Sequence, residues 1–207
     1  MIRRVIAGEG RAFEQACATA SQSGLEHHAV ALPSKDGYNF DIQPLLDGFA
    51  PEQTEVFVAL DERAINTSRQ QLIVQVRMAG YRQFNLISPQ AIVDPGIVLM
   101  GNVHIGPGCN LASGVQVGSG CWLDRQVMVD RNVKLGACVS LLAGVVLGQD
   151  SQVGRGTTLG AGTQALAGTL VGRQCEWLLG GRLPAHLPDQ SFFDALMPDG
   201  ARVLNGR

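Results

Sequence analysis

The sequence predicts a small α/β domain over residues 1–86, a parallel β-solenoid over residues 87–182 and a short C-terminal cap over residues 183–207. Three observations lead to this fold class. An aliphatic residue recurs every six positions from residue 87, strand-like and helix-like segments alternate before that point, and glycine is abundant while aromatic residues are scarce. Abundant turns and a core of aliphatic side chains are typical of repeat architectures.

The composition narrows the classes of function. A chain of 207 residues with 45% hydrophobic content buries a substantial core. Its formal charge of -2 gives no excess of basic residues to bind nucleic acid. No apolar run reaches the roughly 18 residues of a membrane span, and we read no signal peptide at the start. The five cysteines are odd in number and include no CxxC pair. We therefore expect neither a disulfide framework nor a metal site, and a cytoplasmic protein.

The residues before the repeat alternate between strand and helix patterns. We expect strands over residues 4–8, 27–32 and 54–60, and helices over residues 12–23 and 62–80. Such alternation predicts a parallel sheet with a ligand crevice at the carboxyl ends of its strands. Gly8, Glu9 and Gly10 follow the first strand, where backbone amides are able to approach a phosphate, although a plain turn explains them equally well.

Fifteen hexads run from residue 87 to residue 176 without an insertion. The first position of each hexad is Ile, Val or Leu, except at Ala165, and the fifth is small or β-branched throughout. A helix of period 3.6 cannot keep every sixth residue on one face, and an ordinary strand alternates by two. A hexad instead suits one short strand plus one turn, so three hexads form a coil and the array forms about five coils. Residues 191–197, SFFDALM, are expected to cover the open end.

The hexad pattern resembles that of the left-handed β-helix acyltransferases, which are typically trimers. The segments IAGEG, FVALDERAINTSRQQL and GYRQFNLISPQAIVDP extend the likeness to the bacterial sugar acyltransferases that acetylate nucleotide-linked amino sugars or sialic acid. The resemblance implies a Rossmann-like front domain for a nucleotide-sugar and a β-helix for acetyl-CoA, without a metal. By position, Gly8, Glu9, Gly10 and Asp61 would line the acceptor pocket, and Arg69 takes the place of an arginine common in such proteins.

The chain departs from the family at the catalytic base. The family's base histidine stands at the third position of a hexad, which is Arg131 here, followed by Asn132. A second histidine would fall at Ser140, and the backbone amide for the thioester carbonyl maps to Gln149, next to Gly148. Arginine cannot serve as a base at neutral pH, so His104 is the alternative within the array. The family's paired acidic residues after the second strand are also not evident in ALPSKDGYNFD.

Two roles for Arg131 remain open. It either binds a phosphate or carboxylate of a ligand as a rigid fork, or is an exposed or trimer-interface arginine paired with Asp130 or Asp124. Accordingly, the leading function is an acyl-CoA-dependent transferase acting on a sugar or nucleotide-sugar in cell-surface polysaccharide biosynthesis. The alternative is a non-catalytic trimeric homologue that binds a ligand or acts as a scaffold.

Overall fold

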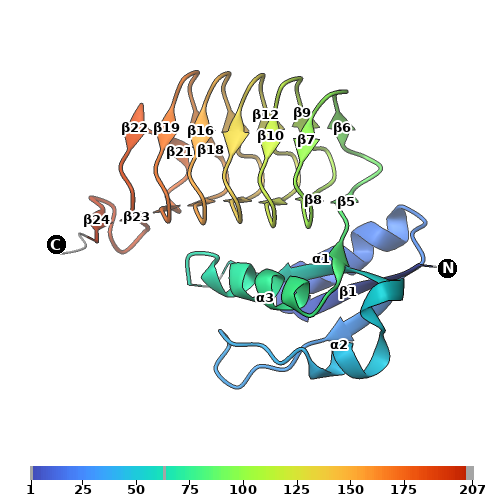
Figure 1. The fold of residues 1–207 in the computed structure, drawn as a ribbon. Coiled ribbons are helices and arrows are strands. Elements are labelled where there is room, and N and C mark those ends of the chain that lie inside the picture. The colour runs from blue at the N-terminus through green and yellow to red at the C-terminus, as the bar shows by residue number, and fades with distance from the viewer. Residues whose placement is uncertain (1, 63, 204–207) are drawn as a thin grey trace.

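The computed structural model describes residues 2–62 and 64–203 (Figure 1). Its front domain holds a four-stranded parallel sheet in the order β2-β1-β3-β4, which we call the front sheet. The side chains of β1 and β3 alternate between two apolar cores: Ile6 and Phe57 pack under α1, whereas Val5 and Val56 pack under α3. The elements are β1 (Arg3–Glu9), α1 (Gly10–Gln22), β2 (His28–Ala31), α2 (Gln43–Gly48), the 3₁₀ turn η1 (Pro51–Gln53), β3 (Thr54–Leu60), α3 (Thr67–Met78) and β4 (Arg82–Gln83).

Helix α3 begins later than the sequence pattern predicts. The pattern indicated a start near residue 62, but three successive residues, Ala64, Ile65 and Asn66, have φ values of 47°, 56° and 58°. This left-handed conformation is costly for residues other than glycine, above all for a β-branched one. Tertiary contacts of Asn66, described below, hold the loop in place and delay the helix to Thr67.

The second part of the chain is a parallel β-solenoid, consistent with a left-handed β-helix. Its coils contain 18 residues, as the pairing of Trp122 with Ser140 shows, and build three parallel sheets. The docked sheet faces the front domain, and the others are called the grooved sheet and the third sheet (Figure 1). The docked sheet contains β5 (Leu86–Ile87), β8 (His104–Ile105), β11 (Trp122–Leu123), β14 (Ser140–Leu141), β17 (Thr158–Leu159), β20 (Glu176–Trp177), β23 (Ser191–Phe193) and β24 (Ala201–Arg202), the last antiparallel. The grooved sheet contains β6 (Ile92–Val93), β9 (Asn110–Leu111), β12 (Met128–Val129), β15 (Val146–Leu147), β18 (Thr163–Ala165) and β21 (Gly181–Arg182). The third sheet contains β7 (Val98–Leu99), β10 (Gln116–Val117), β13 (Lys134–Leu135), β16 (Gln152–Val153), β19 (Leu170–Val171) and β22 (His186–Leu187).

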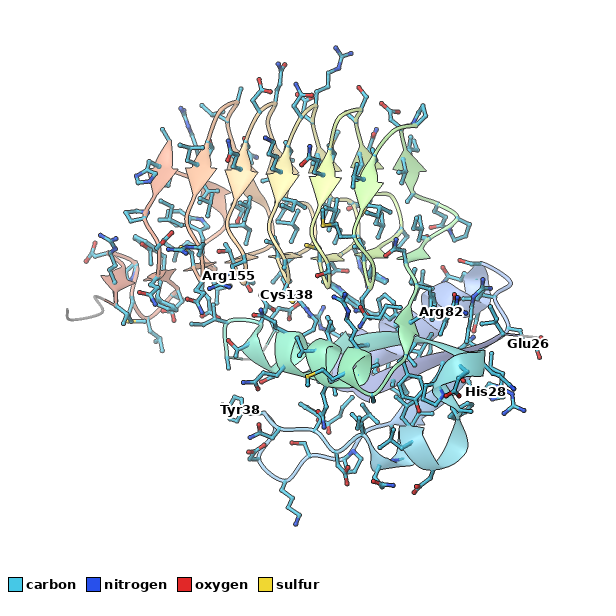
Figure 2. All side chains as sticks on the ribbon, in the orientation of Figure 1. Glu26, His28, Tyr38, Arg82, Cys138 and Arg155 are labelled. Atoms are coloured by element: carbon cyan, nitrogen blue, oxygen red, sulfur yellow. The ribbon has the colours of Figure 1, made fainter. Side chains whose placement is uncertain are left out.

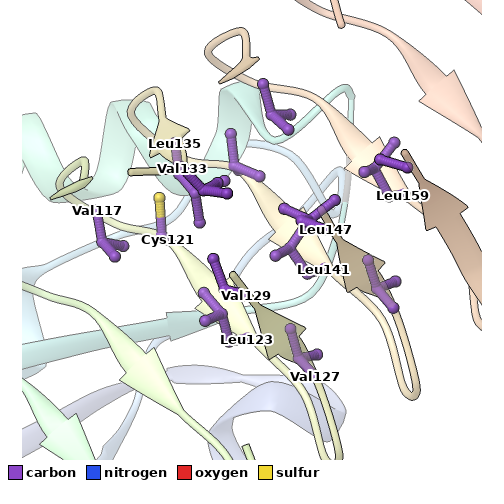
Figure 3. Packing of buried hydrophobic residues seen from close by; sticks show 14 of the residues in the cluster. Val117, Cys121, Leu123, Val127, Val129, Val133, Leu135, Leu141, Leu147 and Leu159 are labelled. Atoms are coloured by element: carbon purple, nitrogen blue, oxygen red, sulfur yellow. The ribbon is translucent and has the colours of Figure 1, made fainter. Parts of the chain in front are cut away.

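Each hexad position has a distinct physical task. Aliphatic first-position residues such as Val129 and Leu141 fill the interior of the coil, and small fifth-position residues such as Cys121 and Val133 pack at its corners (Figure 3). The fourth position takes a left-handed conformation even without glycine, as at Asn132 with φ 60°. Glycine and asparagine tolerate this conformation best, which accounts for their frequency there.

The solenoid has about six coils rather than the predicted five. After Trp177 the hexad rhythm stops, yet β21, β22 and β23 continue the three sheets. The last coil is shorter, because Trp177 pairs with Phe193 only 16 positions later, so a search for a period of six does not detect it. Leu183 and Leu187 still fill its interior. Residues 183–193, which we assigned to a cap, therefore continue the sheets.

The front domain covers one column of side chains on the docked sheet. These are the outward residues of consecutive strands, which elsewhere on the solenoid contact solvent; they are His104, Trp122, Ser140 and Thr158, all at most 2% exposed. Asn102 lies beside the column, and its side-chain amide bonds both the N–H and the C=O of Val58 on β3, at 2.7 and 2.9 Å. The short strand β4 ends its pairing at Val56, so Asn102 continues the edge of the front sheet.

Candidate functional site

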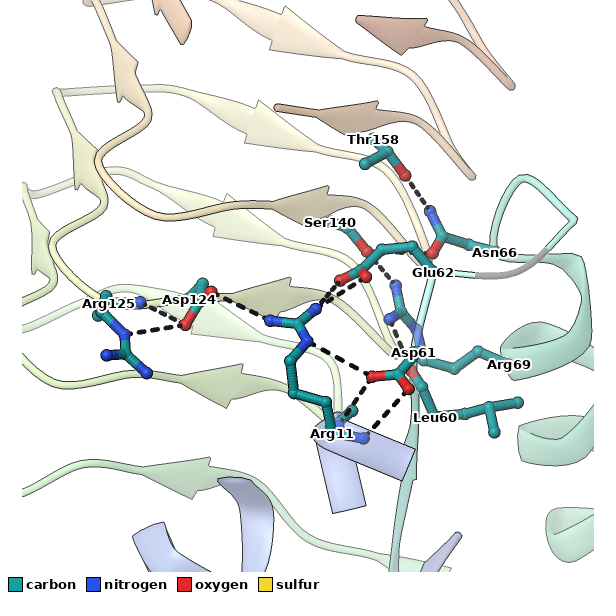
Figure 4. Close-up of polar contacts among 11 residues, drawn as sticks. Arg11, Leu60, Asp61, Glu62, Asn66, Arg69, Asp124, Arg125, Ser140 and Thr158 are labelled. Atoms are coloured by element: carbon teal, nitrogen blue, oxygen red, sulfur yellow. Dashed lines mark hydrogen bonds and ion pairs between the residues drawn. The ribbon is translucent and has the colours of Figure 1, made fainter. Parts of the chain in front are cut away.

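A cluster of charged side chains, the charged cluster, lies where β1 and β3 end and face the solenoid (Figure 4). Arg11, in the first turn of α1, holds Glu62 at 2.9 Å and Asp124 at 3.5 Å through its terminal nitrogens, and its Nε lies 3.8 Å from Asp61. These carboxylates come from the loop after β3 and from the turn after β11. The Arg11 side chain is 45% exposed, so the network adds little to stability. Its main effect is to hold the side chains of Asp61, Glu62 and Asp124 in fixed positions around Arg11.

Asp61 occupies the anion site at the start of α1. Its carboxylate accepts hydrogen bonds from the N–H groups of Arg11 at 3.1 Å and Ala12 at 2.8 Å. The positive end of the helix is therefore met by the chain's own carboxylate. The expectation that amides near Gly8 and Gly10 approach a phosphate is not supported by this geometry. Gly8 is required for another reason, because a side chain there would collide with the backbone carbonyl of Ala59 on β3. Glu9, the last residue of β1, is half-buried.

A buried polar network joins the loop after β3 to the docked sheet. Arg69, 1% exposed, donates to the Leu60 carbonyl at 3.2 Å, the Cys138 carbonyl at 3.4 Å and the Ser140 hydroxyl at 2.7 Å. The Ser140 hydroxyl donates to Asn66, whose amide reaches Thr158 at 3.0 Å. Ser140, a candidate contact for acetyl-CoA by resemblance, is fully buried here. It holds the loop and does not face a ligand site.

His104 also lies in the joint between the domains. It is 2% exposed, stacks on Trp122 with ring centroids 3.9 Å apart, and contacts the Thr19 hydroxyl through Nε2 at 3.1 Å. Its Nδ1 lies 3.2 Å from the Leu123 carbonyl, so we assign the proton of the neutral ring to Nδ1. Burial lowers the pKa of His104 to about 4. This position argues against the catalytic role considered from the sequence, and it also excludes a solvated turn.

Arg131 and Asn132 occupy the corner between the grooved and third sheets, opposite the docked sheet. Both are exposed, and the backbone N–H of Arg131 donates to Asp130 at 2.7 Å. Within the described residues, no hydrogen bond or ion pair engages the Arg131 guanidinium, so the expected pairs with Asp130 or Asp124 do not form. Asp124 pairs instead with Arg11. The Asn132 amide donates to the carboxylate of Asp150 in the next coil.

A shallow groove of about 290 Å³ lies on the grooved sheet beside this corner. Met128 and Val146 form its apolar floor, and Gly148 and Asp130 line its edge. Asp130 is the one ionisable side chain among the described residues that line it. Asp130 lies in the turn after β12, where the alternation of strand side chains does not apply, so its side chain is able to line the same groove as Met128.

The backbone N–H of Gln149 lies one residue beyond Gly148, in the turn that follows β15. Among the residues that the structure describes, it meets no acceptor, while the Gln149 side chain donates to Asp150 at 3.0 Å. An unsatisfied N–H at an exposed corner is a ready donor for a ligand carbonyl. The amide expected at Gln149 therefore has a free donor.

The cysteines behave as packing residues. Burial raises the pKa of Cys109 to about 11 and that of Cys121 to about 12, which keeps both thiols protonated at neutral pH. Across residues 2–62 and 64–203, no group of three or more His, Cys, Asp or Glu side chains gathers to hold a metal ion. In the same part of the chain, no helix has both the length and the apolar character to cross a bilayer.

No model of a known protein family matches the chain, and a search of curated proteins finds no significant match. Solved structures are similar. A histidine-to-alanine mutant of the GDP-perosamine N-acetyltransferase from Caulobacter crescentus, in complex with CoA and GDP-perosamine, superposes with a TM-score of 0.78 and 22% identity, covering 92% of both chains. WeeI from Acinetobacter baumannii gives a TM-score of 0.64 at 12% identity, over 93% of this chain and 96% of that one. The acetyltransferase domain of PglB from Neisseria gonorrhoeae gives 0.51 at 18% identity, over 92% and 95%.

These similarities establish the fold. The chain shares its fold with the GDP-perosamine N-acetyltransferase and with WeeI over more than nine-tenths of its length. At identities of 12–22% they do not carry individual residues across.

Several residues of the site were not evident from the sequence. Arg11 and Asp124 are 113 positions apart, and Asn66 is 92 positions from Thr158, so no local pattern joins them. One signal was present. The sixth hexad positions at Trp122, Ser140 and Thr158 recur every 18 residues on one face, and a tryptophan on an otherwise exposed face indicates a covered surface.

Proposed function

We propose that this protein is an acyl-CoA-dependent acyltransferase that adds an acyl group, most simply acetyl, to a sugar or nucleotide-sugar in cell-surface polysaccharide biosynthesis. The observation that supports it most is the shared arrangement of front domain and solenoid with an enzyme crystallised with CoA and GDP-perosamine. The charged cluster at the ends of β1 and β3 would be the place for the acceptor. Because it lies on the opposite side of the solenoid from Arg131, transfer would take place between the acceptor site of one chain and the groove of a neighbouring copy. Because Asp61 already fills the start of α1, phosphates of a nucleotide acceptor must bind elsewhere.

The groove beside Arg131 is the place we propose for acyl transfer. Acetyl-CoA supplies the acyl group as a thioester, and the free N–H of Gln149 would hold its carbonyl oxygen. Asp130 would accept the proton that the acceptor amine or hydroxyl loses, in the role that histidine has in the family. Arg131 would hold a phosphate or carboxylate of a ligand. Gly148 is needed at this edge because a Cβ there would lie 2.6 Å from the backbone nitrogen of Ala167 in the next coil.

A homotrimer is part of the proposal. The outward face of the grooved sheet carries large apolar side chains, Ile92, Met128 and Val146, which are 62%, 52% and 37% exposed. A row of exposed aliphatic residues on a regular sheet favours burial against another copy of the chain. The five cysteines of the chain are free, and all but Cys17 are buried, which fits a reducing compartment; we propose the cytoplasm.

Calorimetric titration of acetyl-CoA into the full-length protein tests the proposal first, since donor binding does not require the acceptor. We expect saturable binding near one site per chain, followed by release of free thiol in a panel of amino sugars and nucleotide-sugars. Asp130→Asn should retain donor affinity and lose at least a hundredfold in rate. Asp94→Asn, at another turn of the solenoid, is the control. No detectable donor binding would contradict the proposal.

The alternative is a non-catalytic trimeric homologue that binds a ligand or serves as a scaffold. One observation favours it: no histidine lies among the described residues that line the groove, and His104 is buried in the domain joint. Donor binding without any thiol release, unchanged in Asp130→Asn, would select this alternative.

A further inference from the structure

A cleft near the C-terminal end of the solenoid gathers positive charge. It has a volume of about 210 Å³ and lies at the corner between the third and docked sheets. Its lining residues come from three stacked turns and define the arginine cleft: Arg155, Arg173, Gln174, Asp189 and Gln190. Arg155 and Arg173 are 18 positions apart, one full coil, so they occupy equivalent places in neighbouring turns.

The two arginines differ in how they are held. Arg173 is fixed by Asp189, which accepts its Nε–H at 3.0 Å, its Nη2–H at 2.6 Å and its backbone N–H at 2.8 Å. By contrast, no described residue forms a hydrogen bond or an ion pair with the Arg155 guanidinium. Arg202 adds a third guanidinium, with its Nε 3.1 Å from the Asp189 carbonyl. Three guanidinium groups and one carboxylate thus lie in or beside the cleft.

The arginine cleft adjoins the front domain. Asn66, which precedes α3, donates to the carbonyl of Gly156 at 3.3 Å, directly after Arg155. Figure 2 shows Arg155 on the side of the solenoid that faces the loop leading into α3. The first turn of α3 contains no acidic residue, so the positive end of its dipole adds to the same field.

Other exposed arginines lack this combination. Arg11 is already shared by three carboxylates, and Arg125 pairs with Asp124. Arg131 stands next to Asp130, with the carboxylate of Asp150 bonded to its neighbour Asn132. The start of α1 is filled by Asp61. The arginine cleft combines a cavity, a guanidinium without a partner among the described residues, and two further arginines held by Asp189. Arg3 and Arg4 also line a cavity, of about 610 Å³, but Arg4 pairs there with Glu55.

We propose that the arginine cleft binds the phosphate or diphosphate group of a ligand. Turns in adjacent coils lie about 4.8 Å apart, a spacing at which two guanidiniums can bind neighbouring oxygens of one phosphate group. Asp189 orients Arg173 as a fixed fork, Arg155 closes on the anion, and the amides of Gln174 and Gln190 supply further donors. The phosphate site does not require acyl transfer. The identity of the molecule that carries the phosphate does rest on the proposed function. That molecule is either an acyl donor, through its nucleotide end, or a nucleotide-linked acceptor.

Calorimetric titration of the full-length protein with inorganic pyrophosphate tests this site. We expect saturable binding that weakens with rising salt and falls at least tenfold in Arg155→Gln, while Arg77→Gln, an exposed arginine on α3, leaves it unchanged. Thermal unfolding of each variant checks that the fold persists. Equal affinity in Arg155→Gln and Arg77→Gln, or no saturable binding to the unmodified chain, would overturn the proposal.

Two further probes identify the bearer of the phosphate. If the cleft serves an acyl donor, adenosine 3′,5′-bisphosphate should lose affinity in Arg155→Gln and a nucleoside diphosphate should not; if it serves the acceptor, the order reverses. Either result supports the site. Pyrophosphate binding without acetyl-CoA binding would contradict the acyltransferase function and leave the phosphate site standing.

Discussion

The imidazole of His104 is held neutral between Thr19 and the Leu123 carbonyl, and Trp122 shields one ring face from water. Its sequence position, at the end of a hexad, suggested a turn or a base, because nothing local shows that α1 covers it. Asp130 illustrates the opposite case. Its carboxylate lines a groove that its position next to a strand concealed. For both residues the chemistry depends on an environment built by distant segments.

The buried His104 predicts a specific acid sensitivity. Its pKa in the folded protein, about 4, lies below the ordinary value of 6.5, so the unfolded chain binds a proton that the folded chain does not. Its contribution to stability is therefore complete above pH 6.5 and is lost between pH 6.5 and pH 4 as pH falls. From pH 7.5 to pH 5, urea unfolding should show a loss about 2 kcal/mol larger in the natural protein than in His104→Phe. Parallel pH dependences in the two proteins would contradict this assignment.

Gly8 predicts a backbone conflict. A Cβ at this position meets the Ala59 carbonyl of the adjacent strand, so Gly8→Ala forces two central strands apart. We expect a loss of about 3 kcal/mol or more in the free energy of unfolding. Gly48→Ala, at the end of α2 with nothing within 4 Å, is the control and should be close to neutral. Denaturant midpoints measure both, and a small change in Gly8→Ala would leave the ligand explanation for this glycine open.

Among the elements, the edge of β3 shows best how the two domains depend on each other. β4 pairs only with the first part of β3, and Asn102 of the solenoid satisfies Val58 further along. The loop after β3 is held in the same way, since Asn66 and Arg69 reach Ser140 and its neighbours. Each front-domain segment therefore completes its hydrogen bonds with groups from the solenoid.

Removal of the Asn102 amide should expose this dependence. Asn102 has a φ of 53°, a conformation that glycine adopts without strain. Asn102→Gly therefore leaves the buried N–H and C=O of Val58 without partners but adds no backbone strain. We expect a loss of about 2–4 kcal/mol. Asn132→Gly, at an exposed position with φ 60°, should change stability by less than about 1 kcal/mol. Similar urea midpoints for the two variants would show that the change in stability comes from backbone strain and not from loss of the Asn102 amide.

Ser140 provides a second test at the same scale. In Ser140→Ala, the buried Arg69 guanidinium and the Asn66 side chain each lose a partner, and water cannot replace it. The expected loss is about 2–4 kcal/mol, together with faster proteolysis or hydrogen exchange in residues 61–66. Ser113→Ala, on an exposed turn of the solenoid, should be neutral. A neutral Ser140→Ala would mean that the loop is held by other contacts.

The elements that could be predicted were those with strict periodicity. Aliphatic first positions define the coils from Ile87 to Glu176, because the interior of each coil admits only such side chains. The sixth coil escaped prediction, since it lacks two residues and spans a Gly180–Gly181 pair. The start of α3 escaped for a different reason. Three left-handed residues are unfavourable locally and persist only through bonds to the solenoid, which no window of sequence contains.

At the scale of the molecule, the front domain lies along one of the three sheets and leaves two free (Figure 1). Arg131 lies at the corner farthest from the docked sheet, whereas Arg11 and its carboxylate partners lie against that sheet. The candidate residues of one chain are thus spread over different sides of the solenoid. This arrangement fits a protein whose faces are shared with further copies of itself.

The proposed trimer gives a prediction at this scale. Met128→Glu places a charge in the centre of the apolar row on the grooved sheet, and burial of an unpaired charge should block association. Light scattering should find three times the 22.0 kDa chain mass for the natural protein and one chain mass for the variant. Gln116→Glu, exposed on the third sheet, is the matched control. A natural protein that scatters as a single chain would contradict the trimer.

The column from His104 to Thr158 also matches the spacing of the coils to the spacing of the front-domain segments that cover it. Its four residues are separated by three steps of about 4.8 Å. His104 meets α1, Trp122 meets the front sheet, Ser140 meets α3 and the loop before it, and Thr158 meets the last residue of that loop. Deletion of one complete coil from this stretch would keep the hexads in register. It would, however, place the wrong docked-sheet residue against each segment of the front domain. Deletion of residues beyond Glu176 would shorten the solenoid without changing its contacts with the front domain. The contacts of the front domain therefore constrain the number of coils between His104 and Thr158, and not the number beyond Glu176.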